Sequence, residues 1–132
     1  MKKTLGRKRL SESEWQVMKV FWGKGPMALR DVVQELDGAN GWTYGTVKTL
    51  VNRMAGKGWL STQRVGNSYL YSPAVKKSRA IDQALQEFST RVLDGMLSPV
   101  VAYFSEREQL SDEDAKELQS LLDQYRKGRR GR

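Results

Sequence analysis

The chain of 132 residues contains no cysteine, no histidine and only three prolines. The absence of cysteine excludes disulfides and thiol nucleophiles, and the absence of both residue types excludes metal sites built from cysteine and histidine. Histidine is also the usual acid–base group near neutral pH, so the most common proton-transfer residue is missing. The sequence contains no glycine-rich phosphate loop and no nucleophile with a partner base. We therefore expect no enzymatic activity, no cofactor and no metal.

The sequence also has no apolar run approaching the roughly 20 residues that a membrane-spanning helix needs. Its basic N-terminus, MKKTLGRKRL, is not followed by an apolar stretch of signal-peptide length. We therefore expect a cytoplasmic protein with no membrane partner, most naturally from a bacterial cell, which has no nucleus.

Positive charge is what the sequence has in excess, with a net charge of +8 and a pI of about 9.9. Residues 1–72 hold 12 Lys and Arg against 5 Asp and Glu, a net of +7, whereas residues 79–123 hold 4 against 10, a net of −6. A basic surplus suits an acidic partner such as nucleic acid or an anionic membrane, although it also serves simply to keep a protein soluble. The asymmetry indicates that the first half of the chain binds the polyanion.

Two amphipathic helices are predicted in the first third of the chain. Ser11 followed by Glu14 forms a capping-box pattern at the start of the first helix, and GKGP at 23–26 ends it. A second helix fits residues 28–36, and the breaker cluster DGANG at 37–41 follows it. The apolar residues of both helices recur at helical spacing and are expected in the core: Trp15, Val17, Met18, Val20, Phe21, Trp22, Leu29, Val32, Val33 and Leu36.

A third helix and a hairpin come next along the chain. The helix runs from about residue 43 to residue 57, with Thr43 as its N-cap and Gly58 as its C-cap. Two short strands, 59–65 and 68–72, flank the two-residue turn Gly66-Asn67. The buried stripe of the third helix is expected to be Val47, Leu50, Val51 and Met54.

Three helices followed by a hairpin is the order of a winged helix-turn-helix, so the expected fold is mainly α with a small β-hairpin. The outer face of the third helix carries small polar and basic side chains, which fit a major groove about 12 Å wide. Its first turn offers backbone amides to a phosphate, and the hairpin can lie along the DNA backbone. Most polar helix faces are merely solvated, but the fold order, the charge asymmetry and this face together favour DNA. The candidate DNA-binding residues are Thr43, Tyr44, Thr46, Lys48, Thr49, Asn52, Arg53, Arg64 and Asn67.

The last part of the chain is predicted to be helical. A long helical pattern begins near Val75, and a glycine and a proline at 95–99 predict a kink or break there. A last helix is expected at about 112–126, capped by Ser111, and the basic tail is expected to be frayed. The expected domains are a basic arm at 1–10, a winged helix-turn-helix DNA-binding domain at 11–73, a helical dimerisation region at 74–126 and a basic tail at 127–132.

One segment resembles the DNA-binding part, here called the reader, of the penicillinase repressor family: GWTYGTVKTLVNRMAGKGWLSTQRVGNSYLYSP. The family pattern is W-[TS]-x-x-T-[VI]-x-T-[LM]-x-x-R-[LM]-x-x-K-G. The segments LSESEWQVMKVFWGKG and YFSEREQLSDEDAKELQSLLDQY are similar to that family's opening helix and acidic C-terminal helix. The resemblance covers nearly the whole chain after residue 10. It implies a homodimeric transcriptional repressor on a palindromic operator, with each third helix in one half-site of double-stranded DNA.

The resemblance also implies that paired C-terminal helices hold the dimer together. These helices are too short and too apolar to bury their own surface, which agrees with burial between two chains, although packing back onto the reader is an alternative. The residues expected between the chains are Leu85, Phe88, Val92, Met96, Val100, Leu118 and Leu122.

The chain departs from the family pattern at positions that matter for regulation. In the antibiotic-sensing members a membrane sensor leads to cleavage of the repressor, and the matching bond here is Tyr103–Phe104. Those members have asparagine before the phenylalanine, so Tyr103 argues against β-lactam sensing and leaves any upstream sensor protease unknown. Copper-responsive members bind metal through C-terminal cysteines, which are absent here.

The chain also departs from the family in its third helix, where Gly45 stands in place of the larger residue that is usual in the family. The glycine weakens the helix by about 1 kcal/mol relative to alanine and allows the backbone to approach DNA closely.

Two other functions stay open from the sequence alone. An architectural nucleic-acid binder would use the same basic reader with little sequence preference, and competition binding at moderate salt separates it from a repressor. A winged helix can also serve as a protein–protein adaptor. In that case Lys48→Ala and Arg53→Ala would leave function intact.

Overall fold

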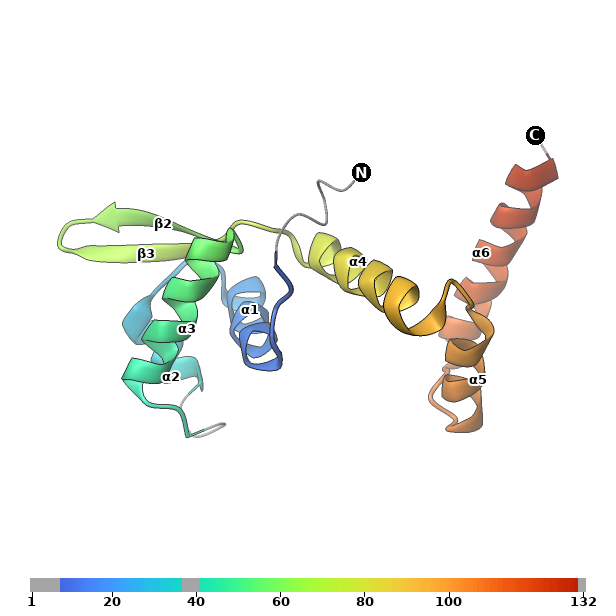
Figure 1. Cartoon of the computed structure of the whole chain (residues 1–132), viewed down its shortest axis with the longest axis horizontal. Helices are drawn as coiled ribbons and strands as arrows, with labels where there is room; N and C mark the ends of the chain where they lie inside the picture. The colour runs from blue at the N-terminus through green and yellow to red at the C-terminus, as the bar shows by residue number, and fades with distance from the viewer. Residues whose placement is uncertain (1–7, 37–40, 131–132) are drawn as a thin grey trace. The chain divides into compact units, whose positions relative to one another are not determined.

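The computed structural model describes residues 8–36 and 41–130 (Figure 1). The first seven residues of the expected basic arm, most of the DGANG cluster and the last two residues of the tail lie outside the described residues. The chain divides into two compact units, one that ends at Glu87 and one that begins at Phe88. The domain boundary expected at residue 73 falls inside the first unit, because Val75 and Ala80 are buried in the same core as the reader.

The first helix, α1 (Glu12–Lys24), begins at the capping box that the sequence predicts. The Glu14 N–H donates to the Ser11 hydroxyl at 3.2 Å, and the Ser11 N–H donates to the Glu14 carboxylate at 2.8 Å. These bonds satisfy amides that would otherwise stay unpaired at the helix start. At the other end Gly25 adopts a φ of 88° and donates its N–H to the Phe21 carbonyl. A positive φ of this size favours glycine.

Within the described residues the sheet has three strands, whereas the sequence predicted two. The additional strand β1 (Met27–Ala28) pairs antiparallel with β3 (Ser68–Pro73), which also pairs with β2 (Leu60–Val65), so the order is β1-β3-β2. The hairpin prediction is confirmed, but a two-residue strand is too short to show the alternation by which strands are recognised. The second helix therefore begins one residue later than expected, and α2 spans Leu29–Leu36.

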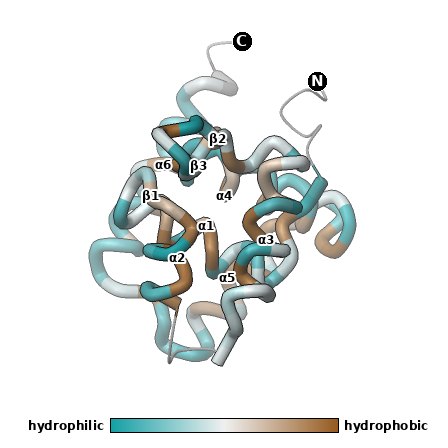
Figure 2. Tube along the Cα trace, turned by 90° about the vertical axis from the view of Figure 1, so that its left-hand side faces the viewer, coloured by the Kyte–Doolittle hydropathy of each residue, from teal (hydrophilic) through white to brown (hydrophobic). Residues whose placement is uncertain are grey.

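The third helix, α3 (Tyr44–Lys57), has both predicted caps, with Thr43 before it and Gly58 after it at a φ of 90°. Trp59, expected as the first residue of a strand, precedes β2 and is buried in the core. The tube in Figure 2 alternates between hydrophilic and hydrophobic stretches along the helices, as amphipathic helices do. The inner faces of α1, α2 and α3 and the sheet form one core that includes Val17, Met18, Phe21, Val32, Leu36, Val47, Val51, Met54, Trp59, Leu60 and Tyr71.

The chain continues with α4 (Lys77–Phe88) and a π-helical turn (Ser89–Leu93), and the predicted break follows. Asp94 and Gly95 adopt positive φ angles of 52° and 82°, which end the helical path. The proline at position 99 lies in the first turn of α5 (Ser98–Glu106), where its missing N–H removes no helical hydrogen bond.

The last helix, α6 (Asp112–Arg130), has the predicted N-terminal cap. The Asp114 N–H donates to the Ser111 hydroxyl at 3.0 Å, and the Ser111 N–H donates to the Asp114 carboxylate at 3.4 Å. The helix continues to Arg130, so the expectation of a frayed tail was wrong for residues 127–130. Basic residues near the C-terminus of a helix interact favourably with its dipole, which supports this extension.

Candidate nucleic-acid interface

All nine candidate DNA-binding residues are exposed, and all belong to the first compact unit. Seven of them lie on α3 or directly before it. The other two lie on the β2–β3 hairpin, which extends beyond the helices of its unit in Figure 1. Because the opposite side of α3 is packed in the core, the unit presents the polar face of α3 and the hairpin to its surroundings.

Two threonines organise the start of α3. Thr43 Oγ1 accepts the N–H of Thr46 at 3.2 Å and lies 3.1 Å from Thr46 Oγ1. Thr43 therefore acts as a helix cap, which is a structural role that it has independently of DNA. Gly45 lies between these two threonines. A Cβ added to it would have Thr43 Oγ1 as its nearest neighbour, at 3.9 Å, so an alanine fits at that position.

Lys48 and Thr49 are available for an external partner. Both are exposed, and within the described part of the chain neither side chain makes a hydrogen bond or an ion pair. A lysine ammonium can contact a phosphate or a guanine edge, and a threonine offers both a hydroxyl and a methyl group. These two side chains can therefore contact DNA without giving up a partner inside the protein.

Asn52 is exposed but already has a partner inside the protein. The Tyr71 hydroxyl on β3 donates to Asn52 Oδ1 at 3.4 Å. The pKa of Tyr71 is raised, first by burial and then by the nearby Tyr44 and Tyr69 hydroxyls. The phenol is therefore protonated and able to donate throughout the physiological range. The sequence did not reveal this contact, because the two residues are 19 positions apart and belong to different elements.

Arg53 is close to a buried carboxylate. Its guanidinium Nη1 lies 3.8 Å from Glu14 Oε2, while about half of the arginine side chain stays exposed. Lys57 Nζ makes the shorter contacts to the same carboxylate, at 2.9 and 3.1 Å. Because Lys57 already neutralises Glu14, the exposed part of Arg53 can turn to another anion without leaving Glu14 unpaired.

The pKa of Glu14 reflects opposing influences. Burial is the largest and raises the pKa, because it disfavours the charged form. The hydrogen bond from Lys57, the backbone N–H of Ser11 and the Lys57 charge act in the opposite direction, and together they lower the pKa below its ordinary value. Glu14 is therefore ionised at neutral pH and connects α1 to α3.

Two further contacts hold residues 8–10 against the end of α3. Lys57 Nζ donates to the Arg9 carbonyl at 3.3 Å, and Trp59 Nε1 donates to the Lys8 carbonyl at 2.9 Å. Leu10 is buried in the core. The described part of the expected basic arm is therefore attached to the reader.

The tip of the hairpin carries the remaining two candidates. Arg64 Nε donates to the Gly66 carbonyl at 3.2 Å, which holds the arginine along the turn. Gly66 has a φ of 63°, as a tight turn requires at this position. Arg64 and Asn67 are both exposed. The rest of the guanidinium can therefore reach a phosphate beside the hairpin.

Most of the candidate dimerisation residues are exposed apolar side chains. Five of them, Leu85, Phe88, Val92, Met96 and Leu122, are exposed, whereas Val100 and Leu118 are half-buried. Isolated exposed apolar residues are normal, but all of these except Leu85 belong to the second unit, and several exposed apolar side chains in so small a unit are typical of surface that a partner covers.

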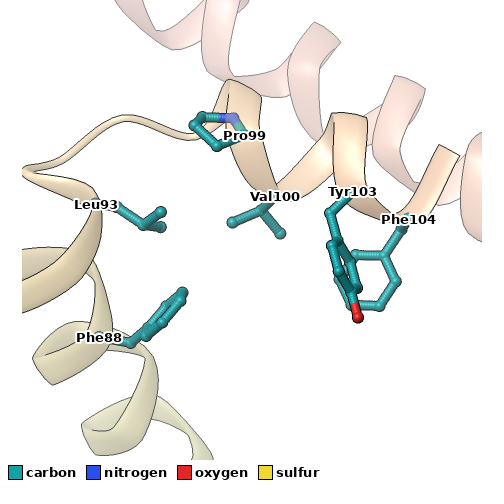
Figure 3. A pocket seen from close by; sticks show the side chains of 6 residues that line it. All are labelled: Phe88, Leu93, Pro99, Val100, Tyr103 and Phe104. Carbon is teal, nitrogen blue, oxygen red and sulfur yellow. The ribbon is translucent and has the colours of Figure 1, made fainter. Parts of the chain in front are cut away.

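The second unit contains an apolar pocket of about 360 Å³ (Figure 3). The bond Tyr103–Phe104, which matches the family's cleavage site, lies inside α5 at this pocket, and the two rings pack edge to face with centroids 5.2 Å apart. The Arg107 guanidinium lies 3.8 Å from the Tyr103 ring centroid. Helical backbone and ring packing both oppose the extended conformation in which peptide bonds enter a protease. The pocket is lined by Phe88, Leu93, Pro99, Val100, Tyr103 and Phe104.

Residues 8–36 and 41–130 contain no cluster of three or more acidic side chains placed to hold a metal ion. In the same ranges no helix is both long and apolar enough to cross a membrane.

Comparison with known proteins identifies the family. A family model described as penicillinase repressor matches residues 10–124. The penicillinase repressor of Bacillus licheniformis is 30% identical over 118 residues, which cover 89% of this chain and 92% of that protein. The methicillin resistance regulatory protein MecI of Staphylococcus aureus (strain N315) is 26% identical over 113 residues, covering 86% and 92%.

A solved structure agrees with these sequence matches. The DNA-binding domain of the repressor BlaI is 29% identical and superimposes with a TM-score of 0.50, covering 55% of this chain and 92% of that domain. The resemblance found in the sequence is confirmed, as is the winged-helix fold. This chain belongs to the penicillinase repressor family of DNA-binding transcriptional repressors.

Proposed function

We propose that this protein represses transcription by binding a specific operator, with α3 in the major groove and the β2–β3 hairpin along the adjacent backbone. The observation that carries the proposal is the outward face of α3, where Lys48 and Thr49 are exposed without a partner among the described residues. A helix with small polar side chains and a packed inner face can enter a groove without losing its own support.

The proposed contacts divide into two kinds. Thr46, Thr49 and Asn52 reach base edges and select the sequence, whereas Arg53 and Arg64 contact phosphates and position the protein. Lys48 can serve either role. Phosphate contacts release counterions, so affinity should fall as salt rises, whereas the preference for the operator persists.

We further propose that two copies bind an inverted repeat. The exposed apolar residues of α4, α5 and α6 would be covered by the second copy, which gives two readers related by a two-fold axis. Half-sites about one DNA turn apart would suit such a dimer. The protein would act in the cytoplasm and would need neither a cofactor nor catalytic activity.

Selection of bound duplexes from genomic DNA, followed by competition binding near physiological salt, tests the proposal. The selected fragments should share an inverted repeat and bind at least about a thousandfold more tightly than random duplex. Thr49→Ala should reduce that preference, and Lys48→Ala should weaken operator binding. Lys116→Ala on α6, which removes the same charge as Lys48→Ala but outside the reader, should do neither. Equal affinity for random and selected DNA would indicate an architectural binder. No DNA binding at all would indicate a protein–protein adaptor.

A further inference from the structure

The hydroxyl of Tyr71 reaches the exposed face of α3 from a fixed position. Tyr71 lies on the central strand β3, where its backbone is in register with Met27 of β1 and Thr62 of β2. Its side chain is only 7% exposed and belongs to the core. Because the strand is paired on both sides and the ring is packed, the hydroxyl cannot follow the movements of the side chains on α3.

The contact between this hydroxyl and Asn52 distinguishes the two ends of the amide. A largely buried phenol O–H normally requires an acceptor, and Asn52 Oδ1 supplies one at 3.4 Å. The reversed amide would turn an N–H group toward the hydroxyl and withdraw this acceptor from the phenol proton. The oxygen of Asn52 therefore faces the sheet, and its two N–H donors are left for an external partner.

We propose that Tyr71 sets the base preference of Asn52 by holding its amide with the donor end toward DNA, an inference that rests on the proposed function. An unrestrained asparagine pairs best with adenine, since it accepts from N6 and donates to N7. The oxygen keeps a second lone pair, but while it faces Tyr71 and the sheet the amide directs its N–H donors outward, and these match the N7 and O6 acceptors of guanine. Asn52 therefore reads guanine, and Tyr71 is a positioning residue that does not touch the base.

The experiment is selection of bound sequences from a random duplex library, with the full chain in its wild-type, Tyr71→Phe and Asn52→Ala forms. In the wild type, one position of each half-site should favour guanine over adenine by about tenfold. Tyr71→Phe keeps the ring and removes only the hydroxyl, so that ratio should fall to near one or invert while the other positions stay unchanged. Asn52→Ala should lose its preference at the same position.

Tyr69→Phe is the matched control. Tyr69 lies two residues before Tyr71 on the same face of β3, and about half of its side chain is exposed. Removing its hydroxyl leaves the contact between Tyr71 and Asn52 in place, so the ratio of guanine to adenine should not change. A purely structural role for Tyr71 would weaken binding to all sequences equally, and thermal unfolding of Tyr71→Phe measures that contribution separately.

The outcomes separate this inference from the proposed function. If the wild-type protein selects no sequence, the repressor proposal fails and this inference fails with it. If the wild type selects an operator but Tyr71→Phe keeps the same ratio, Tyr71 does not position Asn52 and the inference is overturned. If Asn52→Ala leaves every base preference unchanged, Asn52 does not read a base. The inference is then overturned while the repressor proposal stands.

Discussion

Replacing Glu14 with alanine should destabilise the protein by about 3–5 kcal/mol, which is the usual cost of removing one partner from a buried ion pair. The Glu14 side chain is completely buried, and Lys57 Nζ lies 2.9 Å from its Oε1 atom. Alanine would leave the Lys57 ammonium, itself only 20% exposed, without that carboxylate. The same substitution also removes the capping-box bond to Ser11. Its cost is included in the loss of about 3–5 kcal/mol, because the effects of neighbouring interactions do not simply add. Arg53 contributes little, since about half of its side chain is exposed.

Urea denaturation of the full chain, monitored by tryptophan fluorescence, measures this change in the free energy of unfolding. Glu12→Ala is the matched control, because Glu12 is exposed in the same first turn and contributes about 0.3–1 kcal/mol through the helix dipole. Glu14→Gln keeps an acceptor for the capping box but loses the charge, so its effect should be intermediate. If Glu12→Ala and Glu14→Ala destabilise the protein equally, the buried pair does not hold α1 to α3.

The same pair predicts a dependence on pH. The pKa of Glu14 in the folded protein is lower than in the unfolded chain, where it is near 4.5. The stability that the charge contributes is therefore complete above that value and is lost as the pH falls through the folded-state pKa. The difference in stability between the wild type and Glu14→Gln should shrink in urea titrations below pH 4.5. A difference that stays constant into that acidic range would contradict this account.

Three further predictions concern the reader and the dimer. Gly45→Ala should raise the free energy of unfolding by about 1 kcal/mol, because alanine favours a helix and the Cβ has room. It should also weaken operator binding in fluorescence anisotropy if the backbone approaches DNA closely there, and unchanged affinity would exclude such an approach. A chain truncated after residue 72 should unfold at lower urea than one truncated after Glu87, because it loses Ala80 from the core; equal midpoints would contradict this. Leu122→Lys should shift sedimentation from dimer to monomer and weaken operator binding, whereas an unchanged dimer would place the interface elsewhere.

Local signals in the sequence were sufficient to predict most of the reader. Ser11 and Glu14 form their capping box within one helical turn, and the caps of α3 lie beside the helix that they end. β1 was missed because its two residues form a strand only through backbone pairing with β3, which lies some forty positions later in the chain. A two-residue strand has no periodicity of its own to detect.

The internal partners of the candidate residues could not be predicted for a related reason. The sequence marks Asn52 and Arg53 as polar positions on one helix face, and the structure confirms their exposure. Their contacts with Tyr71 and Glu14, however, depend on how the sheet and α1 pack around α3. Glu14 in particular has a complete local role in its capping box, so nothing in the sequence calls for a second partner 43 residues away.

These two contacts together hold α3 in one orientation, which the proposed role as a DNA reader requires although the outer face of the helix is polar and solvated. Apolar packing alone resists tilting but tolerates small rotations of a helix about its own axis, because hydrophobic contact is not directional. Glu14 holds Lys57 and Arg53 from the side of α1, and Tyr71 holds Asn52 from the side of the sheet. Rotation in either direction would lengthen one of these directional contacts. The orientation of the helix that carries Lys48 and Thr49 is therefore fixed before any DNA binds, so binding need not supply the free energy to orient the helix.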